Sequence, residues 1–286
     1  MSKAKIREVN ELGTLVKIGS GIALAILLIP VFIVVLTGLN SGDHLTFPPE
    51  GISLRWIFAF FRSEEFLSAF LFSFGLALIT MALSTIFGTL AAIFITRFSF
   101  PGSQLLRALF LSPLILPGIV LGLALYIFYV STDIGLARSY PGMVIAHMLV
   151  TMPYVIGTVS ASLFNFDLNL EQAARSLGAS PLTAFRKVTL PNISNGVMAG
   201  SVFAFIVSFG QFDVSLFMAT PNNTPLPIAL YWSLRYTFEP TAAAAGIFAI
   251  ALVITSMLIT SKLVNLQKFS GVKFDYDYSW LSTPQF

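Results

Sequence analysis

The chain has 286 residues, of which 56% are hydrophobic and only 10% are charged. Soluble domains carry a charge on about a quarter of their residues, so this chain lacks the polar surface of a water-facing globule. It has no cysteine and only two histidines, His44 and His147, which are far apart in the sequence. Disulfides, thiol nucleophiles and a histidine-based metal centre are therefore excluded. No phosphate-binding loop, esterase serine motif or HExxH string occurs, so we expect a membrane protein that does not hydrolyse ATP itself.

A membrane-spanning helix needs about 20 apolar residues to cross roughly 30 Å of hydrocarbon, where its backbone must bond to itself. Six segments qualify: 18–39, 67–95, 108–130, 141–164, 196–218 and 241–261. The sequence therefore predicts an all-α membrane protein with six transmembrane helices. Pro113, Pro117 and Pro153 predict kinks in the third and fourth of these. A seventh apolar stretch, 226–234, is too short to cross and is predicted to be interfacial or re-entrant.

Basic residues divide unequally between the two sides of the membrane that six spans define. Twelve lie on the side of the termini and of the loop 165–195, and four lie on the other side. Positively charged loops stay on the cytoplasmic side, so both termini are predicted to be cytoplasmic. The net charge of +3 is explained by this topology, and no nucleic-acid partner is expected. On the external side, Trp56, Phe58, Phe60 and Phe61 are typical of an aromatic belt.

The loop 165–195, NFDLNLEQAARSLGASPLTAFRKVTLPNISN, carries the signals of two short helices. Asn169 is a candidate N-cap with Gln172 three residues later, which predicts a first helix over residues 170–177. Gly178 suits the left-handed residue that closes a helix. Ser180 as N-cap and Pro181 as first residue predict a second helix.

This second helix should end near residue 189, before Leu190 and Pro191. Leu182, Phe185 and Val188 would form its apolar stripe.

The spacing in this loop resembles the EAA signature of ABC importer permeases, which is E-A-A, three residues, G, nine residues, and I-x-L-P. The matching positions are Ala173, Ala174, Gly178, Val188, Leu190 and Pro191. The glutamate position is Gln172, and Glu171 precedes it, so the charge is lost at that position. In the family this loop docks in a groove of the cytoplasmic ATPase. The resemblance therefore implies an ATPase-coupling site made of these residues together with Glu171, Gln172, Ala179 and Phe185.

The resemblance implies a type I (MetI-like) permease fold and non-catalytic membrane subunit in the bacterial inner membrane. Its expected partners are a second permease chain, most simply a different one, two copies of a cytoplasmic ATPase, a periplasmic substrate-binding protein and the lipid bilayer. No cofactor is expected on this chain, because ATP and Mg belong to the ATPase. The expected organisation is a cytoplasmic segment (1–17), a first transmembrane helix (18–39), a periplasmic loop (40–66), a five-helix core (67–261) that contains the coupling loop (165–195), and a cytoplasmic tail (262–286).

Three further strings look similar to permeases of the spermidine and putrescine type: PPxGxSLRW after the first span, AHxxxxxPYV in the fourth, and SFGQFDVSLF followed by TPLPIALYWSLR. This resemblance implies a polyamine substrate such as putrescine or spermidine. The same group includes permeases for opines, aminoethylphosphonate and amino-acid-like compounds, so these substrates stay open.

Asp213 is the only formal charge inside the six predicted spans, and Gln211 lies beside it. A carboxylate at the centre of a bilayer costs about 2.5–3.5 kcal/mol, so it should face a wet cavity or a partner. Asp213 and Gln211 are therefore candidate residues of a path for a cationic substrate. The alternative is that Asp213 hydrogen-bonds within the bundle near the outer end of its span.

Two small motifs are expected to serve packing alone. His147 is predicted to make a hydrogen bond inside the bundle, because a proton relay would need more titratable groups. The pairs Gly118 with Gly122 and Gly196 with Gly200 predict close helix approach. An ion-coupled secondary transporter would carry several charges within its spans, and an intramembrane enzyme would carry a nucleophile with a base, so both alternatives are disfavoured.

Overall fold

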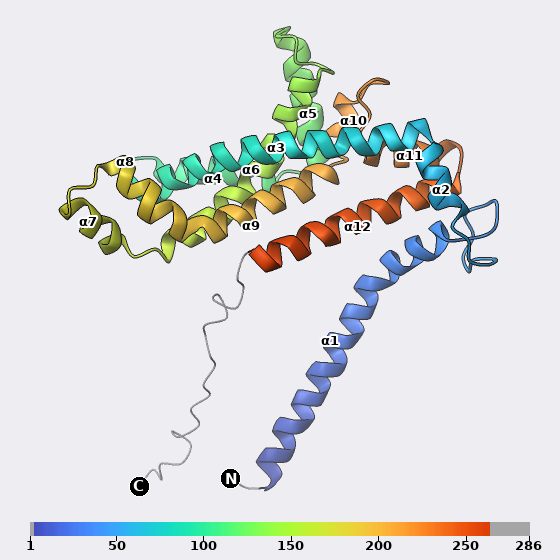
Figure 1. Cartoon of the computed structure of the whole chain (residues 1–286), viewed down its shortest axis with the longest axis horizontal. Helices are drawn as coiled ribbons and strands as arrows, with labels where there is room; N and C mark the ends of the chain where they lie inside the picture. Colours follow the sequence, from blue (N-terminus) through green and yellow to red (C-terminus); the bar gives the residue numbers. More distant parts are fainter. Residues whose placement is uncertain (1–2, 264–286) are drawn as a thin grey trace.

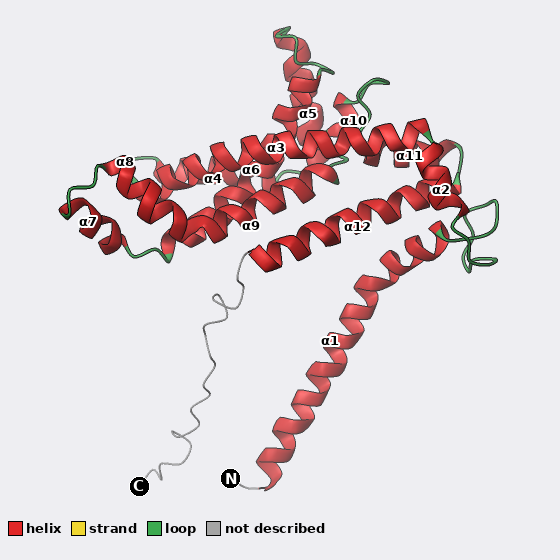
Figure 2. Ribbon diagram, viewed as in Figure 1, coloured by secondary structure: helices red, strands yellow, loops and turns green. Residues whose placement is uncertain are grey.

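The computed structural model describes residues 3–263, with side chains for residues 16–262. These residues form helices and loops without a strand (Figure 2). In chain order the elements are α1 (Lys3–Gly38), α2 (Arg55–Arg62), α3 (Glu64–Arg97), α4 (Ser103–Leu111), the 3-10 turn η1 (Ser112–Leu114), α5 (Gly118–Thr132), α6 (Tyr140–Phe164), α7 (Leu168–Ser176), α8 (Pro181–Ala184), the π-helical turn η2 (Phe185–Thr189), α9 (Leu190–Phe209), α10 (Ser215–Met218), α11 (Leu226–Tyr236) and α12 (Pro240–Leu263). The predicted all-α fold is confirmed.

The core of the bundle is formed by α3, α6 and α9, which run side by side along the long axis of the molecule (Figure 1). Small residues permit this approach. A Cβ atom added at Gly196 would lie 2.7 Å from the Thr158 carbonyl oxygen, and one at Gly200 would lie 2.9 Å from the Val155 Cα. A Cβ at Gly88 of α3 would lie 2.8 Å from the Val155 Cβ. The predicted close approach at Gly196 and Gly200 is therefore confirmed, and it joins α9 to α6.

Five helical stretches in the described part of the chain are long and apolar enough to cross a membrane: Val16–Gly38, Glu64–Arg97, Tyr140–Phe164, Pro181–Phe209 and Pro240–Lys262. A sixth span arises if the pair Ser103–Leu114 and Gly118–Thr132 is counted as one. The two parts of that pair are bent by 105°. The predicted third span is therefore broken rather than kinked.

Proline explains this break. Pro113 lies in η1, and Pro117 directly precedes α5. A proline offers no N–H, and its ring disfavours helical geometry at the residue before it, so two prolines four residues apart interrupt the helix. Pro153, in contrast, lies inside α6, which continues through it. The neighbouring helices α3 and α9 both pack against α6, and such packing lets membrane helices tolerate a proline.

The predicted fifth span, 196–218, is also corrected. The helix begins much earlier, at Pro181, and ends at Phe209. Residues 210–214 are not helical, and the short helix α10 follows. Asp213 and Gln211 thus lie in a break between two helices rather than inside one.

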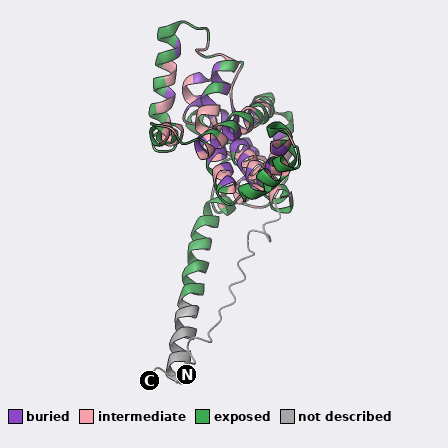
Figure 3. Cartoon of the chain, turned by 90° about the vertical axis from the view of Figure 1, so that its left-hand side faces the viewer, coloured by how far each residue is buried: buried purple, intermediate pink, exposed green. Residues whose placement is uncertain are grey.

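Peripheral elements close the far end of the bundle. The last turns of α1 pack on α12, where a Cβ at Gly38 would lie 3.0 Å from Ala243, while residues 16–32 of α1 are exposed (Figure 3).

The side chain of Phe60 in α2 is buried and stacks on Phe248 of α12, with 4.5 Å between ring centroids. Phe60 is therefore a core residue, and its assignment to an exposed aromatic belt was wrong; Phe58 and Phe61 are exposed. The predicted short apolar segment forms α11.

Candidate ATPase-coupling site

The coupling loop forms a compact helical end piece at one end of the bundle, formed by α7, α8 and η2 (Figure 1). The first of these helices begins earlier than predicted. Asp167 is its N-cap, and its carboxylate accepts a hydrogen bond from the Asn169 N–H at 2.9 Å. The predicted cap at Asn169 was therefore wrong, and Gln172 is exposed. A carboxylate suits this position because it bonds a free N–H and faces the positive end of the helix dipole.

The end of α7 follows the prediction at Gly178. This glycine has φ +90°, a conformation that side-chain-bearing residues rarely adopt. Its N–H donates to the Arg175 carbonyl at 3.0 Å, and the Ala179 N–H donates to the Ala174 carbonyl at 3.1 Å. These two bonds form a complete Schellman motif, which gives the reversal between α7 and α8 a defined geometry.

The second helix begins as predicted, because the Ser180 side chain accepts from the Thr183 N–H at 3.3 Å and Pro181 occupies the first turn. It does not stop at Leu190 and Pro191, however. The π-helical turn η2 carries the chain directly into α9, and the Leu190 N–H bonds the Phe185 carbonyl five residues earlier. A wider turn accommodates the Pro191 ring, which would otherwise crowd the carbonyl four residues before it. Residues 181–209 therefore form one continuous helical stretch from the loop into the membrane.

A charged cluster joins the loop to the bundle. Arg97, the last residue of α3, pairs with Glu171 of α7 at 2.8 Å between Nη2 and Oε2. The Thr189 hydroxyl donates to the same carboxylate oxygen at 2.6 Å, and Arg97 Nη2 donates to the Thr189 hydroxyl at 3.3 Å. The side chains of Arg97 and Glu171 are 20% and 15% exposed. The Arg97–Glu171–Thr189 cluster thus connects α3, α7 and η2 at one point.

The electrostatics of this cluster favour an ionised glutamate. Burial alone would raise the pKa of Glu171, but the hydrogen bond from Thr189 and the hydrogen bond and positive charge of Arg97 outweigh it, with a smaller contribution from Arg175. The pKa of Glu171 is therefore held below its usual value. The sequence placed Glu171 in the coupling site, but nothing in the sequence indicated its partner on α3.

The outer surface of the loop exposes large apolar side chains among polar and basic ones such as Arg186 and Lys187. Leu177 is 90% exposed and Leu182 is 65% exposed. Of the predicted apolar stripe, Leu182 is exposed and Phe185 and Val188 are half-buried, while Ala184 and Thr189 are the buried residues of this segment. The other predicted coupling residues are either exposed or half-buried. Gln172, Ala173, Gly178, Leu190 and Pro191 are exposed, and Ala174, Ala179, Phe185 and Val188 are half-buried.

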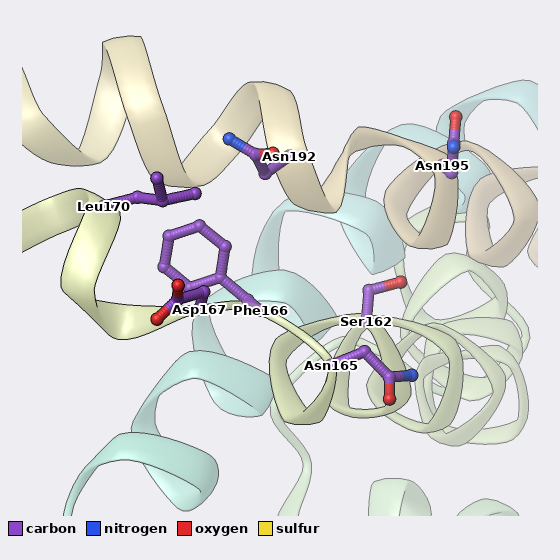
Figure 4. A pocket seen from close by; sticks show the side chains of 7 residues that line it. All are labelled: Ser162, Asn165, Phe166, Asp167, Leu170, Asn192 and Asn195. Atoms are coloured by element: carbon purple, nitrogen blue, oxygen red, sulfur yellow. The ribbon is translucent and has the colours of Figure 1, made fainter. Parts of the chain in front are cut away.

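A hollow of about 280 Å³ lies inside the loop, between the end of α6, α7 and the beginning of α9. Its lining, shown in Figure 4, is Ser162, Asn165, Phe166, Asp167, Leu170, Asn192 and Asn195. The Phe166 ring is directed toward Leu170 and Asn192 in this view. Its residues come from three elements, so no single stretch of the sequence predicts this hollow.

The break that follows α9 brings Asp213 to the beginning of α5. A Cβ added at Gly118 would lie 2.9 Å from the Asp213 Cβ and Cγ, and one at Gly122 would lie 2.9 Å from the Val214 Cα. The pair Gly118 and Gly122 therefore accommodates the segment 213–217 rather than a second long helix. A carboxylate at the N-terminus of a 15-residue helix is favoured by the helix dipole.

The described residues thus form an apolar helix bundle with a helical end piece that an ion pair joins to α3. Residues 84–267 match the family described as "Binding-protein-dependent transport system inner membrane component", and the chain belongs to this family. It is a non-catalytic permease subunit of an ABC importer, located in the inner membrane, and the ATPase is a separate chain.

Curated relatives agree with this family. The chain is 27% identical over 247 residues to the spermidine/putrescine transport system permease protein PotC of Escherichia coli strain K12, covering 86% of this chain and 92% of that protein. It is 31% identical over 218 residues to the putrescine transport system permease protein PotI of the same strain, covering 74% and 76%. It is also 34% identical over 212 residues to the chloroplastic sulfate permease 2 of Chlamydomonas reinhardtii, covering 70% and 58%.

Solved structures share the fold. A bacterial ABC transporter involved in the import of the acidic polysaccharide alginate superposes with a TM-score of 0.70 at 15% identity, covering 92% of this chain and 99% of that chain. The MetNI methionine ABC transporter in an inward-facing conformation gives a TM-score of 0.54 at 18% identity, covering 71% and 98%. The predicted type I importer fold is thereby confirmed.

Proposed function

We propose that this permease subunit moves a small cationic solute, a polyamine such as putrescine or spermidine, that a periplasmic binding protein delivers. Two copies of a cytoplasmic ATPase would drive the cycle, with ATP and Mg bound on those chains, and a second, different permease chain would complete the pathway. Support comes from the two relatives whose names refer to spermidine and putrescine. The sulfate permease among the relatives makes an anionic solute the alternative to be tested.

The observation that carries the coupling proposal is the continuity of the coupling loop with α9. In this proposal the ATPase contacts the exposed Leu177 and Leu182 from the cytoplasm, and its closure moves α7. The Arg97–Glu171–Thr189 cluster passes that movement to α3, and the unbroken stretch Pro181–Phe209 passes it along α9. At 1.5 Å per residue this stretch is about 40 Å long, enough to reach across the membrane.

The same stretch ends at the break that holds Asp213, which supports a role for this residue in the substrate path. Asp213 and Gln211 are half-buried in this break. A single carboxylate beside the end of α9 would attract a cation as the bundle opens toward it. Moving an equilibrium between two conformations of the bundle, closed and open toward this break, from 1:99 to 99:1 requires about 5.5 kcal/mol. A rigid helical connection can transmit such a bias, and a flexible loop cannot.

The test is uptake by the complete transporter, reconstituted in liposomes with its binding protein and ATPase. We expect ATP-dependent uptake of labelled putrescine or spermidine but not of sulfate, and Asp213→Asn should lower it about tenfold, the effect of losing about 1.4 kcal/mol. Asp133→Asn is the matched control, because Asp133 is an exposed carboxylate at the other end of α5. Uptake of sulfate alone would refute the polyamine assignment. Unchanged polyamine uptake in Asp213→Asn would refute the role of Asp213.

A further inference from the structure

His147 of α6 bonds the two helices on either side of the break. Its Nδ1 lies 2.9 Å from the Ser208 hydroxyl, in the last turn of α9, and its Nε2 lies 2.9 Å from the Ser215 hydroxyl, at the first residue of α10. The His147 side chain is buried, with 1% exposure, and both serines are buried as well. The predicted hydrogen bond inside the bundle is confirmed, but it is double and its partners flank the non-helical residues 210–214.

The direction of each bond follows from the number of protons. The Ser215 hydroxyl donates its single proton to the Gln211 carbonyl at 2.7 Å, so toward His147 it can only accept. The Nε2–H therefore donates to Ser215. A neutral imidazole then accepts at Nδ1, so the Ser208 hydroxyl donates to it. Ser208 thus donates to Nδ1 of His147, and Ser215 accepts from Nε2 and donates to the Gln211 carbonyl. The Gln211 backbone therefore belongs to the same chain of hydrogen bonds.

These bonds continue away from the break into the core. The Thr151 hydroxyl, one turn after His147 on α6, donates to the His147 carbonyl at 2.9 Å. It also lies 2.7 Å from the Ser84 hydroxyl of α3. Ser84 and Thr151 are fully buried like His147, but they do not contact residues 208–215 through these bonds. This series of hydrogen bonds therefore contains His147, which bonds both sides of the break, and the equally buried Thr151, which does not.

We propose that His147 is a positioning residue of the translocation path. By bonding Ser208 and Ser215 together, it fixes the shape of residues 210–214 and so the place at which Gln211 and Asp213 are presented. A buried histidine that served packing alone could be satisfied by one helix. Here its two ring nitrogens hold two separate helices, and a change in their relative orientation must break one of the bonds. This proposal rests on the proposed function for the role of Asp213, whereas the two hydrogen bonds of His147 do not depend on that function.

The experiment uses the full transporter in liposomes and a single cysteine at Gln211→Cys; this chain has no other cysteine, and labelling is followed on this chain alone. Two readouts are taken: the rate at which a water-soluble methanethiosulfonate reagent labels position 211 in the Gln211→Cys background, and the amount of solute moved per ATP by variants that keep Gln211. His147→Leu removes both hydrogen bonds, and His147→Gln can still donate and accept. Thr151→Val is the matched control, because it removes a buried hydroxyl of α6 that does not bond either side of the break. Ser208→Ala and Ser215→Ala each remove one bond.

We expect His147→Leu to raise the labelling rate about tenfold and to lower the solute moved per ATP, because two hydrogen bonds are lost and each is worth about a factor of three. Ser208→Ala and Ser215→Ala should give smaller changes in the same direction, His147→Gln should restore part of the original behaviour, and Thr151→Val should change neither readout. If Thr151→Val raised labelling as much as His147→Leu, or if neither serine variant altered it, the proposal would be overturned. The serine variants decide the question if His147→Leu does not assemble. Labelling does not require a substrate, so failure of polyamine uptake alone would count against the proposed function and not against this proposal.

Discussion

Arg97 and Glu171 form an ion pair across 2.8 Å that joins the last residue of the longest core helix, α3, to the first turn of α7. Thr189 bonds both partners and lies in the π-helical turn before α9. The coupling loop is therefore bonded to one membrane helix and continuous with another. A force applied to α7 reaches the bundle by two routes, and this arrangement leads to the predictions that follow.

Removing the charge of Glu171 should loosen α7 without unfolding the bundle. Glu171→Gln leaves the partly buried Arg97 without its anionic partner, which should cost about 1–3 kcal/mol of local stability. The measurement is amide hydrogen exchange of residues 168–176 in the purified permease, which should become faster. Glu65→Gln is the control, since Glu65 is an exposed carboxylate in the first turn of α3. Equal protection of α7 in Glu171→Gln and the natural protein would contradict the ion pair.

The pH dependence of this cluster follows from the lowered pKa of Glu171. A carboxylate with a lowered folded-state pKa contributes its full stability above the ordinary value of 4.5 and loses it as the pH falls through the folded-state pKa. Protection of α7, corrected for intrinsic exchange rates, should therefore be constant between about pH 6 and pH 8 and should fall only in acid, below about pH 4.5. Glu171→Gln should abolish the acid-dependent loss. A loss of protection already near pH 7 would show that another group controls the loop.

The contact between α6 and α9 should not tolerate larger side chains. Gly200→Leu would place a Cβ 2.9 Å from the Val155 Cα, a backbone atom that cannot move aside. We expect a loss of about 1–3 kcal/mol, seen as a lower thermal unfolding temperature of the detergent-purified permease. Gly157→Leu is the matched control on α6, because a Cβ there meets no atom within 4 Å. Similar unfolding temperatures for the two variants would mean that the helices do not pack this closely.

The exposed leucines of the coupling loop should matter for assembly and not for folding. Leu177→Ser and Leu182→Ser change side chains that are 90% and 65% exposed, so the stability of the isolated permease should shift by less than about 0.5 kcal/mol. Recovery of the ATPase with the tagged permease should fall, because burying each leucine in an interface is worth about 1.5–3 kcal/mol. Phe128→Ser, at an exposed apolar residue of α5, serves as the control. Undiminished ATPase recovery in the Leu177→Ser, Leu182→Ser double variant would remove these leucines from the interface.

Much of the fold could be predicted because hydropathy reports which segments lie in the membrane. Hydropathy does not report whether a segment is one helix. Pro113 and Pro117 indicated a disturbance of the third span, but the size of the bend depends on how α5 packs against residues 213–217. The break after Phe209 has no proline to announce it. Conversely, Pro191 suggested an end where the π-helical turn permits continuation.

The candidate site was predictable to the extent that it is local. Gly178, Ser180 and Pro181 act within a few residues of themselves, and the structure places them as expected. The partner of Glu171 is on α3, and the partners of His147 are on α9 and α10, so these contacts depend on the assembled bundle. At α7 the predicted cap, Asn169, was wrong, because the carboxylate of Asp167 caps the helix two residues earlier.

The central claim, that the coupling loop is gripped by a separate ATPase, is tested most directly by crosslinking in intact membranes. The natural chain has no cysteine, so a single cysteine at Leu177 or Ala173 defines the site of reaction with a short thiol-to-amine crosslinker. We expect both positions to capture the ATPase, and a cysteine at the exposed Ile127 of α5 to capture none. Failure of both loop cysteines to capture the ATPase, or their labelling by an impermeant reagent applied from the periplasmic side, would contradict the account.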